Sequence, residues 1–385
     1  MKIVIVCFTY SPSFSYMENQ LAKAFQVLGH NVSLIASTES YVQDKIERFS
    51  PGDYVYDNLA VKRISFAWKG NYLAHKLWKM KGLSQALEDF QPDIIYHMNI
   101  CGLEIKNSVI YVNHNPKTTI FFDNHAAFYN SGKNWVSKYL RYQLILGNYV
   151  RRASEKSMKI FYIGNGEKYF LENNFHIPTQ KLELFPLGDF ILSDDQYLVT
   201  RKQIRTQNSV SNECQVICHT GKLNKSKYTI EIINSFLYAG VQDSQLWIIG
   251  GIENDIYDDV MTLIHENSDR IKYFGWKNSS QLSELLCACD IYVQLSVSST
   301  FLTALCRKCV GVSINPVDTY NYIPKEIYYQ IATPSCLKHT LKKILDFPGQ
   351  ISSKRQESYI FAKDNLDYLT LVDRLILQPH ANKNI

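Results

Sequence analysis

The sequence predicts an α/β protein with two doubly wound Rossmann-like domains that face each other across a cleft. Buried strands and amphipathic helices alternate from the first residues, and the same alternation restarts after an irregular polar stretch at 189–212. A chain of 385 residues is also too long for one typical domain and fits two. With 46% hydrophobic and 20% charged residues, the chain can bury two cores.

The first half opens with a β-loop-α-β unit. Residues 2–7 are a continuous apolar run, which is typical of a buried parallel strand. A helix at 17–28 ends at Gly29, and the next strand is expected at 30–36. Further strands are expected at 61–66, 94–98, 109–112, 119–122, 160–164 and 182–185, with a helix at 167–173. We expect this domain to span residues 1–195; it has no G-x-G-x-x-G dinucleotide fingerprint.

The second half repeats the alternation. Strands are expected at 215–218, 246–251, 271–276, 291–295 and 310–314, separated by helices at 229–239, 255–266, 279–287 and 300–307. We expect a second domain at 196–358 and a final helix within 359–385 that returns to the first domain. Ligands bind at the carboxyl ends of parallel strands, so the residues that follow these strands are the candidates for a functional site.

A glycine and three lysines follow the strand at 215–218. Gly221 permits close backbone approach, and Lys222, Lys225 and Lys227 supply positive charge. The helix that follows offers unpaired N–H groups and the positive end of its dipole. This combination predicts a phosphate or pyrophosphate site. A solvated basic turn is the alternative, and the surrounding α/β domain favours the phosphate site.

A polar cluster follows the strand at 119–122. Asp123, Asn124 and His125 converge at its carboxyl end, which is a typical place for catalytic groups. His125 is a candidate general base or acceptor-binding group. The alternative is a structural histidine that caps the strand.

Residues 133–159 combine aromatic with basic side chains, and Glu155 is their one acid. A helical surface of this kind suits an anionic membrane face, whereas an ordinary amphipathic helix with a solvated basic side is the alternative. The same composition suits nucleic acid, but no recognised nucleic-acid-binding module accompanies it, so we expect no nucleic-acid partner. The basic residues are Lys133, Lys138, Arg141, Arg151, Arg152, Lys156 and Lys159.

Composition restricts the cellular compartment in which the protein is expected and the state of its cysteines. The net charge of +5 is mild, no signal peptide is recognisable, and no stretch reaches the ~18 uncharged apolar residues of a membrane span. The nine cysteines are odd in number, and several lie in apolar patterns, which indicates reduced thiols in a cytoplasm. The lone CxxC at Cys306 and Cys309 is interpreted as a structural thiol pair, because a zinc site needs a second ligand pair.

Several motifs resemble those of GT-B glycosyltransferases, most closely the retaining family 4, and the resemblance spans nearly the whole chain. In the first half it rests on Tyr10-Ser11-Pro12, Glu18, residues 28–32 and residues 91–95, with Ser15 and Tyr16 where the family usually has paired glycines. In the second half it rests on Pro186-Leu187-Gly188-Asp189, Gly221-Lys222-Leu223 with Lys227, Ile249-Gly250-Gly251, Phe274-Gly275-Trp276 and residues 289–293.

The resemblance implies transfer of a sugar from a nucleotide-diphosphate-sugar to a glycan acceptor. The basic and aromatic surface of 133–159 suggests that this acceptor is lipid-linked, as in surface polysaccharide or glycoconjugate synthesis. The resemblance implies that Lys222 and Lys227, with Gly221, hold the donor diphosphate, and that His125 acts on the acceptor side as the catalytic residue, with Ser15 and Asn124. It also implies that the nucleotide lies against Gly250, Gly251, Gly275 and Trp276. The chain has no D-x-D, so we expect no metal, and no cofactor beyond the donor.

The chain departs from the family at one motif. The family carries two glutamates on the loop and helix after the strand at 291–295, and a gapless comparison places Leu295 and Thr303 there. We expect Ser299 and Thr300 to bind phosphate at that helix N-terminus, and Thr303 to face the nucleotide. The missing acids motivate one alternative function, a non-catalytic GT-B-like subunit of another transferase; a sugar-nucleotide epimerase or hydrolase is a second.

Overall fold

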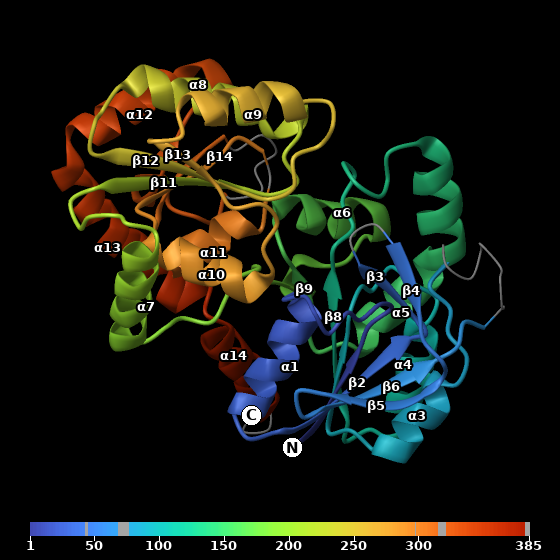
Figure 1. The fold of residues 1–385 in the computed structure, drawn as a ribbon. Coiled ribbons are helices and arrows are strands. Elements are labelled where there is room, and N and C mark those ends of the chain that lie inside the picture. Colours follow the sequence, from blue (N-terminus) through green and yellow to red (C-terminus); the bar gives the residue numbers. More distant parts are fainter. Residues whose placement is uncertain (43–44, 68–76, 297, 315–320, 382–385) are drawn as a thin grey trace. The chain divides into compact units, whose positions relative to one another are not determined.

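The computed structural model describes residues 1–42, 45–67, 77–296, 298–314 and 321–381. The chain divides into two compact units (Figure 1). The first comprises Met1–Pro186 together with the C-terminal segment from Leu371, and the second comprises Leu187–Thr370. Each unit is built on its own, mainly parallel β-sheet.

The first unit contains an eight-stranded sheet among the described residues, in the order β10-β9-β8-β7-β1-β2-β6-β5. All neighbouring strands are parallel except β5, which pairs with β6 in an antiparallel hairpin at one edge. The central strand β1 has neighbours on both sides, and Ile3 is paired with Val32 of β2 and Ile94 of β7. The strands are β1 (Lys2–Val6), β2 (Asn31–Ser37), β5 (Gly52–Tyr56), β6 (Leu59–Ile64), β7 (Ile94–His97), β8 (Thr119–Asn124), β9 (Ile160–Tyr162) and β10 (Leu182–Leu184).

Helices cover both faces of this sheet. Successive side chains of β1 point to opposite faces, so Val4 and Val6 join one apolar cluster while Ile3 and Ile5 point away from it. That cluster contains side chains of α3 (Leu83–Phe90), α4 (Ile105–His114), α5 (Gly147–Lys156) and α6 (Asn165–Phe175). Helix α1 (Met17–Val27) packs against β1 and β2, with Leu21 and Phe25 fully buried.

In the second unit, the described residues form a six-stranded parallel sheet in the order β13-β12-β11-β14-β15-β16. Its helices also form two layers (Figure 1). Side chains of α8 (Thr229–Ala239), α9 (Tyr257–Glu266) and α12 (Leu337–Asp346) share one apolar cluster, and those of α7 (Asp194–Gln207), α10 (Ser279–Ala288), α11 (Thr300–Cys306) and α13 (Pro348–Asn365) share another. The strands are β11 (Gln215–Thr220), β12 (Ser244–Ile249), β13 (Ile271–Tyr273), β14 (Ile291–Gln294), β15 (Val310–Ser313) and β16 (Tyr329–Gln330).

The strand expected at 109–112 is wrong, because these residues belong to helix α4. Their β-branched and aromatic run imitates a strand, but α4 connects β7 to β8, which are parallel neighbours. Parallel neighbours need a crossover, and a helix is its usual form. Ile105, Ser108 and Tyr111 are buried at helical spacing.

The stretch expected to be irregular at 189–212 also contains a helix, α7. Ser193 and Gln196 form a capping box, in which each side chain bonds to the other's backbone N–H. Short elements that the sequence did not predict are the antiparallel pair β3 (Glu39–Val42) and β4 (Lys45–Arg48), together with β5, β16, α3 and α12.

The single final helix expected within 359–385 is two helices, α13 and α14 (Tyr368–Ala381). Between them, the Leu366 carbonyl accepts a hydrogen bond from the Asp189 N–H at 3.1 Å, and Asp367 Oδ1 accepts one from the Ile191 N–H at 3.1 Å. A Cβ at Gly188 would lie 1.9 Å from the Leu366 carbonyl oxygen, so only glycine permits this approach of the two backbones. The helical segment is therefore interrupted between α13 and α14, where the first residues of the second unit lie against it.

Candidate functional site

The lysine turn lies at the carboxyl end of β11. Gly221 follows the strand with φ of 130°, a conformation that favours glycine. A single 3₁₀ turn, Lys225–Lys227, and then Tyr228 with φ of 57° separate this glycine from α8. Lys222 and Lys227 therefore lie on the connection between β11 and α8, before the helix begins.

Backbone hydrogen bonds join the predicted glycines along the edge of the sheet. The Gly221 N–H donates to the Ile249 carbonyl at 3.1 Å, and the Gly250 N–H donates to the Gly275 carbonyl at 2.9 Å. A Cβ at Gly250, whose φ is 141°, would lie 1.9 Å from the Gly221 carbonyl oxygen. Glycine is therefore required at 250, and the loops after β11, β12 and β13 form one continuous backbone edge.

Two predicted residues continue this edge. The Gly251 carbonyl accepts a hydrogen bond from the Leu223 N–H at 2.8 Å, which fixes the lysine turn against the end of β12. Trp276 follows Gly275 and is 53% exposed, so its ring is available for contact with a planar ligand.

The two lysines differ in their surroundings. Lys222 Nζ lies 3.1 Å from Glu253 Oε1, and its side chain is 62% exposed, so this is a surface ion pair that an anionic ligand can replace. Lys227 is half-buried, and burial lowers its pKa. A cation that is partly removed from water gains more from an incoming phosphate than an exposed one does.

The loop after β14 lies beside the lysine turn. The strand order places β14 next to β11 on the side away from β12, so the chain's direction across the sheet reverses between β11 and β14. Crevices at such reversals bind ligands in α/β sheets. Ser299 is exposed, Thr300 begins α11, and Thr303 lies one turn later, half-buried. The Thr300 N–H already donates to Ser298 Oγ at 3.3 Å, so a phosphate would compete with that bond.

Leu295 takes no part in this surface. It is 2% exposed within an apolar cluster, so this position is part of the core.

A buried polar chain that sequence reasoning missed connects the ends of β11 and β14. Thr220 Oγ1 lies 2.9 Å from the Tyr292 hydroxyl, which donates to Gln294 Oε1 at 2.9 Å. Gln294 Nε2 in turn donates to Ser296 Oγ at 2.9 Å. A tyrosine and a glutamine that alternate within an otherwise apolar strand are the signal that could have revealed it. These hydrogen-bonded side chains hold the carboxyl ends of β11 and β14 together.

His219 provides a second connection. Its Nδ1 lies 3.1 Å from the Val293 carbonyl oxygen and its Nε2 lies 3.2 Å from Thr229 Oγ1. Burial lowers the pKa of His219 to about 4, so the ring is neutral near pH 7. A neutral ring that donates through Nδ1 accepts the Thr229 hydroxyl at Nε2, and β11 is thereby tied to both β14 and α8.

In the first unit, the polar cluster lies at the end of β8. Asn124 is fully buried, and its Nδ2 donates to the Ala126 and Glu167 carbonyls at 2.8 and 3.1 Å. Its Oδ1 accepts the Ala126 N–H at 3.1 Å. These bonds give Asn124 a structural part in shaping the turn, whereas the neighbouring His125 side chain is 32% exposed.

Carboxylates surround His125. Its Nε2 lies 3.4 Å from Oδ2 of Asp123, which is fully buried. Burial acts to lower the pKa of His125, but the charges of Asp123, Glu18 and Glu167 together outweigh it and raise that pKa. The raised pKa favours a ring that carries a proton and points partly to solvent, able to donate it or to hold an anionic or hydroxyl oxygen.

Glu18 is a functional candidate to which sequence reasoning assigned no role. It lies in the first turn of α1 and is 8% exposed. Burial raises the pKa of Glu18 to about 7, although its own backbone hydrogen bond and His125 act in the opposite direction. A carboxyl group that titrates near neutrality can exchange protons with its surroundings. The signal was its place just after the loop that follows β1.

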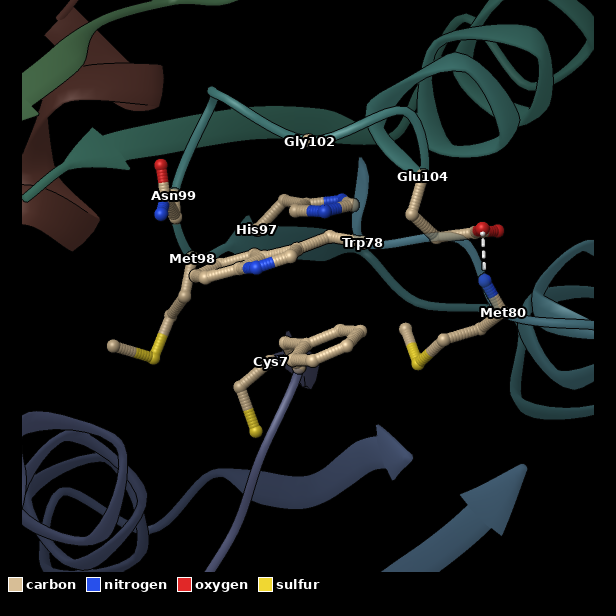
Figure 2. Close-up of a pocket in the computed structure, with 9 residues that line it drawn as sticks. Cys7, Trp78, Met80, His97, Met98, Asn99, Gly102 and Glu104 are labelled. Carbon is tan, nitrogen blue, oxygen red and sulfur yellow. Dashed lines mark hydrogen bonds between the residues drawn. The ribbon is translucent and has the colours of Figure 1, made fainter. Parts of the chain in front are cut away.

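A small cavity, of about 10 Å³, lies at the carboxyl ends of β1 and β7 and has room for about one water molecule (Figure 2). His97 lines it, with Nδ1 2.8 Å from Ser108 Oγ, and burial lowers its pKa to about 3. Glu104 Oε2 accepts the Met80 N–H at 2.7 Å beside it. Ser15, the remaining acceptor-side candidate, is exposed and lines a much larger cavity of about 370 Å³.

The segment 133–159 is helical over most of its length. It contains the π-helix η1 (Val136–Leu146) followed directly by α5. Tyr142 and Leu146 are buried against the first unit, whereas Trp135 and Leu144 are 72% and 73% exposed. No helix among the described residues is long and apolar enough to cross a membrane. In the same residues, no group of three or more histidine, cysteine or carboxylate side chains is arranged to hold a metal ion.

Comparison with solved structures identifies the fold. The chain resembles HepE from Anabaena in complex with UDP and glucose, with a TM-score of 0.67, 12% identity and coverage of 99% of this chain and 100% of that one. It resembles a glycosyltransferase from Rickettsia africae, with a TM-score of 0.67, 14% identity and coverage of 100% and 99%. It also resembles WaaG, a glycosyltransferase involved in lipopolysaccharide biosynthesis, with a TM-score of 0.63, 14% identity and coverage of 97% and 98%. No protein-family model and no curated protein sequence matches the chain. These structures confirm the predicted resemblance to GT-B glycosyltransferases and the α/β architecture of two Rossmann-like units.

Proposed function

From this GT-B fold, we propose that the protein is a glycosyltransferase that moves a sugar from a nucleotide-diphosphate-sugar to a glycan acceptor. The observation that carries the proposal is the edge of the second sheet, where glycine backbones and two lysines surround the reversal between β11 and β14. Phosphate oxygens need close backbone approach and positive charge, and this edge offers both. HepE has been solved with UDP bound, which is consistent with a nucleotide at this edge.

In the proposed reaction, Lys222 and Lys227 neutralise the diphosphate as the bond to the sugar breaks. Gly250, Gly251 and Gly275 let the nucleotide approach the backbone, and Trp276 supplies a ring for the base. Ser299 and Thr300 add donors from the other side of the reversal, and Thr303 lies behind them. No carboxylate lies in 295–305, so we infer that the lysine turn supplies most of the donor affinity.

On the acceptor side, the Asp123 carboxylate lies 3.4 Å from His125 Nε2, and we propose that Nδ1 of the ring contacts the acceptor hydroxyl. Ser15 lies on the loop after β1, at the carboxyl end of the same sheet. We place His125 as the catalytic residue and propose that the reaction needs neither a metal nor a cofactor besides the donor.

Calorimetric titration with UDP tests the donor site. We expect the Lys222→Ala, Lys227→Ala double variant to lose about 2 to 4 kcal/mol of binding free energy, because it removes two charge-assisted contacts. Lys202→Ala is the matched control, since Lys202 is an exposed lysine on α7 in the same unit. Unchanged UDP binding in the double variant would remove the donor site from this turn.

Product analysis after incubation with a nucleotide sugar, with and without an acceptor, separates the alternatives. A transferase yields a new glycoside only when an acceptor is present, whereas an epimerase converts the donor alone. A chain that binds no nucleotide sugar but co-purifies with a transferase would support the partner-subunit alternative, which the missing glutamates motivate.

We further propose that the surface of 133–159 binds the anionic cytoplasmic face of a membrane, where a lipid-linked acceptor would lie. Trp135, Tyr139 and Leu144 are exposed on this surface, which supports insertion at the headgroup level. Flotation with phosphatidylglycerol vesicles tests it. We expect Trp135→Ser with Leu144→Ser to abolish flotation, and Val199→Ser, an equally exposed change on α7, to leave it intact. Flotation that survives the double change would exclude this surface.

A further inference from the structure

A groove lies within the first unit, between α1 and the hairpin of β5 and β6. Its volume of about 370 Å³ falls in the range of small-molecule sites, roughly 300–1,000 Å³. The loop after β1 lines one end, through Tyr10 and Ser15, and the hairpin lines the other side, through Tyr56 and Asp57. Gln26 near the end of α1 closes it, where its Nε2 donates to the Asn58 carbonyl at 3.0 Å. We define these residues as the α1 groove.

Tyrosine rings and amide side chains alternate along the groove. Tyr10 and Tyr56 have ring centroids 6.0 Å apart, and Tyr54 continues the row with its ring plane 3° from that of Tyr56. From α1, the amide side chains of Asn19, Gln20 and Gln26 line the same space. A sugar ring has an apolar face of C–H groups and a rim of hydroxyls, so it needs an aromatic surface and groups that both donate and accept.

One polar atom of the groove lacks a protein partner. Asn19 Nδ2 donates to the Ser11 carbonyl at 3.1 Å, but Asn19 Oδ1 is buried and has no hydrogen bond within the described part of the chain. A buried acceptor without a partner is costly, and because this atom is closed to solvent, a ligand hydroxyl would reach it only after the Asn19 side chain turns toward the groove.

The charges of the groove favour a neutral ligand. Lys23 and Asp57 both line it and have opposite sign. The nearby guanidinium of Arg63 is buried and donates to the Tyr10 and Ser37 carbonyls at 2.9 and 3.1 Å, so it is already engaged by backbone. A phosphate or polyanion would meet no concentrated positive charge among these residues.

We infer that the α1 groove binds a neutral oligosaccharide, namely the part of the glycan acceptor beyond the sugar that reacts. The inference rests on the proposed glycosyltransferase function for the identity of the ligand. The groove begins at Ser15, on the loop proposed to hold the reacting end, and follows α1 to Gln26. That stretch of helix is about 16 Å long, so the groove takes several sugar residues, and the enzyme acts on a growing chain in preference to a free sugar.

Saturation-transfer NMR on the full chain tests this inference, with maltotetraose, cellotetraose and chitotetraose as probes and glucose and N-acetylglucosamine as their single units. We expect at least one tetraose to bind and its single unit to bind much more weakly. Tyr56→Ala and Gln26→Ala should each weaken that binding about tenfold, because each removes one contact type from the groove. Val55→Ala is the matched control, since Val55 precedes Tyr56 on β5 and is 73% exposed.

Three results would overturn the inference. They are the absence of binding for all three tetraoses, wild-type binding in both groove variants, and displacement of the tetraose by UDP, which would place the sugar in the donor site. A thermal-shift titration of Tyr56→Ala with UDP separates the two proposals. If UDP stabilises neither wild type nor variant while the tetraose still depends on Tyr56, the donor proposal fails and the groove stands.

Discussion

Asp290 and Asp123 are both buried carboxylates beside a parallel strand, but they lie at opposite ends of their strands. Asp290 directly precedes β14 in the second unit, and Asp123 lies near the end of β8 in the first. Their surroundings differ as much as their positions. Asp290 accepts hydrogen bonds from several donors, whereas Asp123 lies near other acidic side chains.

Three arginines surround Asp290. Its oxygens lie 2.6 Å from Arg201, 2.7 Å from Arg205 and 3.1 Å from Arg355, and one also accepts the Val216 N–H at 2.8 Å. Arg201 and Arg205 come from α7, and Arg355 comes from α13. The carboxylate therefore ties two helices to the amino end of the sheet, which is a structural task.

Asp123 has fewer donors. Its Oδ1 accepts the Asn99 N–H at 2.5 Å, while Oδ2 faces His125 at 3.4 Å, an ion pair without hydrogen-bond alignment. Glu18 lies close enough to raise the pKa of His125. Asp123 itself is fully buried, so its charge acts on the partly exposed His125 ring beside it. We therefore propose that the amino edge serves stability and that the carboxyl edge serves function.

The largest loss of stability is expected for Asp290→Ala. Removing this carboxylate leaves three guanidinium groups without their shared partner, and breaking a buried ion pair costs about 3–5 kcal/mol of unfolding free energy. Calorimetric melting measures the loss. Asp194→Ala removes a carboxylate that is 75% exposed and pairs with Lys308 in the same unit, so it should change the melting temperature far less. Equal losses in the two variants would contradict a special role for Asp290.

The second-largest effect is the pH dependence of stability that Glu18 causes. The folded-state pKa of about 7 lies above the ordinary value of 4.5, so the native state holds a proton that the unfolded chain releases. The resulting stabilisation is complete below about pH 4.5 and is lost as pH rises through about 7. We expect Glu18→Gln to abolish this loss, which amounts to about 3 kcal/mol at most.

Urea unfolding at several pH values between 4 and 8 measures this difference. The variant should gain on the wild type as pH rises, and the gap should stop widening above about pH 7. Parallel stability curves for the two proteins would show that Glu18 ionises normally in the folded state.

The smallest effect on stability, and the most specific, is expected for Asp123→Asn. The amide still accepts the Asn99 N–H but no longer offers a charge to His125, so the pKa of His125 should fall. NMR titration of the histidine ring carbons measures it. His219, buried in the second unit, is the internal control. An unchanged pKa of His125 in the variant would show that the Asp123 carboxylate does not set it.

Much of the fold could be predicted because buried parallel strands are continuous apolar runs. The runs at 2–7 and 215–218 became β1 and β11, and the glycines after the strands of the second unit lie at the edge where they were expected. The run at 109–112 was wrongly predicted to be a strand, because β-branched residues suit a strand locally. The connection between two parallel strands required a helix there.

Helix α7 was missed for a different reason. Its buried positions include Arg205, whose guanidinium bonds to Asp290 and to backbone carbonyls, so the helix lacks an ordinary apolar stripe. Its capping box, Ser193 with Gln196, was nevertheless visible in the sequence. In the candidate site, Glu18 was noted as a motif residue but was given no role, because the burial that raises its pKa depends on how α1 packs on the sheet and does not follow from its place after the β1 loop.

The most direct test of the contrast between the two edges is calorimetric melting of Asp123→Asn and Asp290→Asn side by side. The two substitutions are chemically identical and differ only in the edge at which they lie. We expect Asp290→Asn to lower the melting temperature of the second unit by about 10 °C, and Asp123→Asn to leave that of the first unit unchanged or slightly higher. Equal destabilisation by the two substitutions would contradict the assignment of a structural amino edge and a functional carboxyl edge.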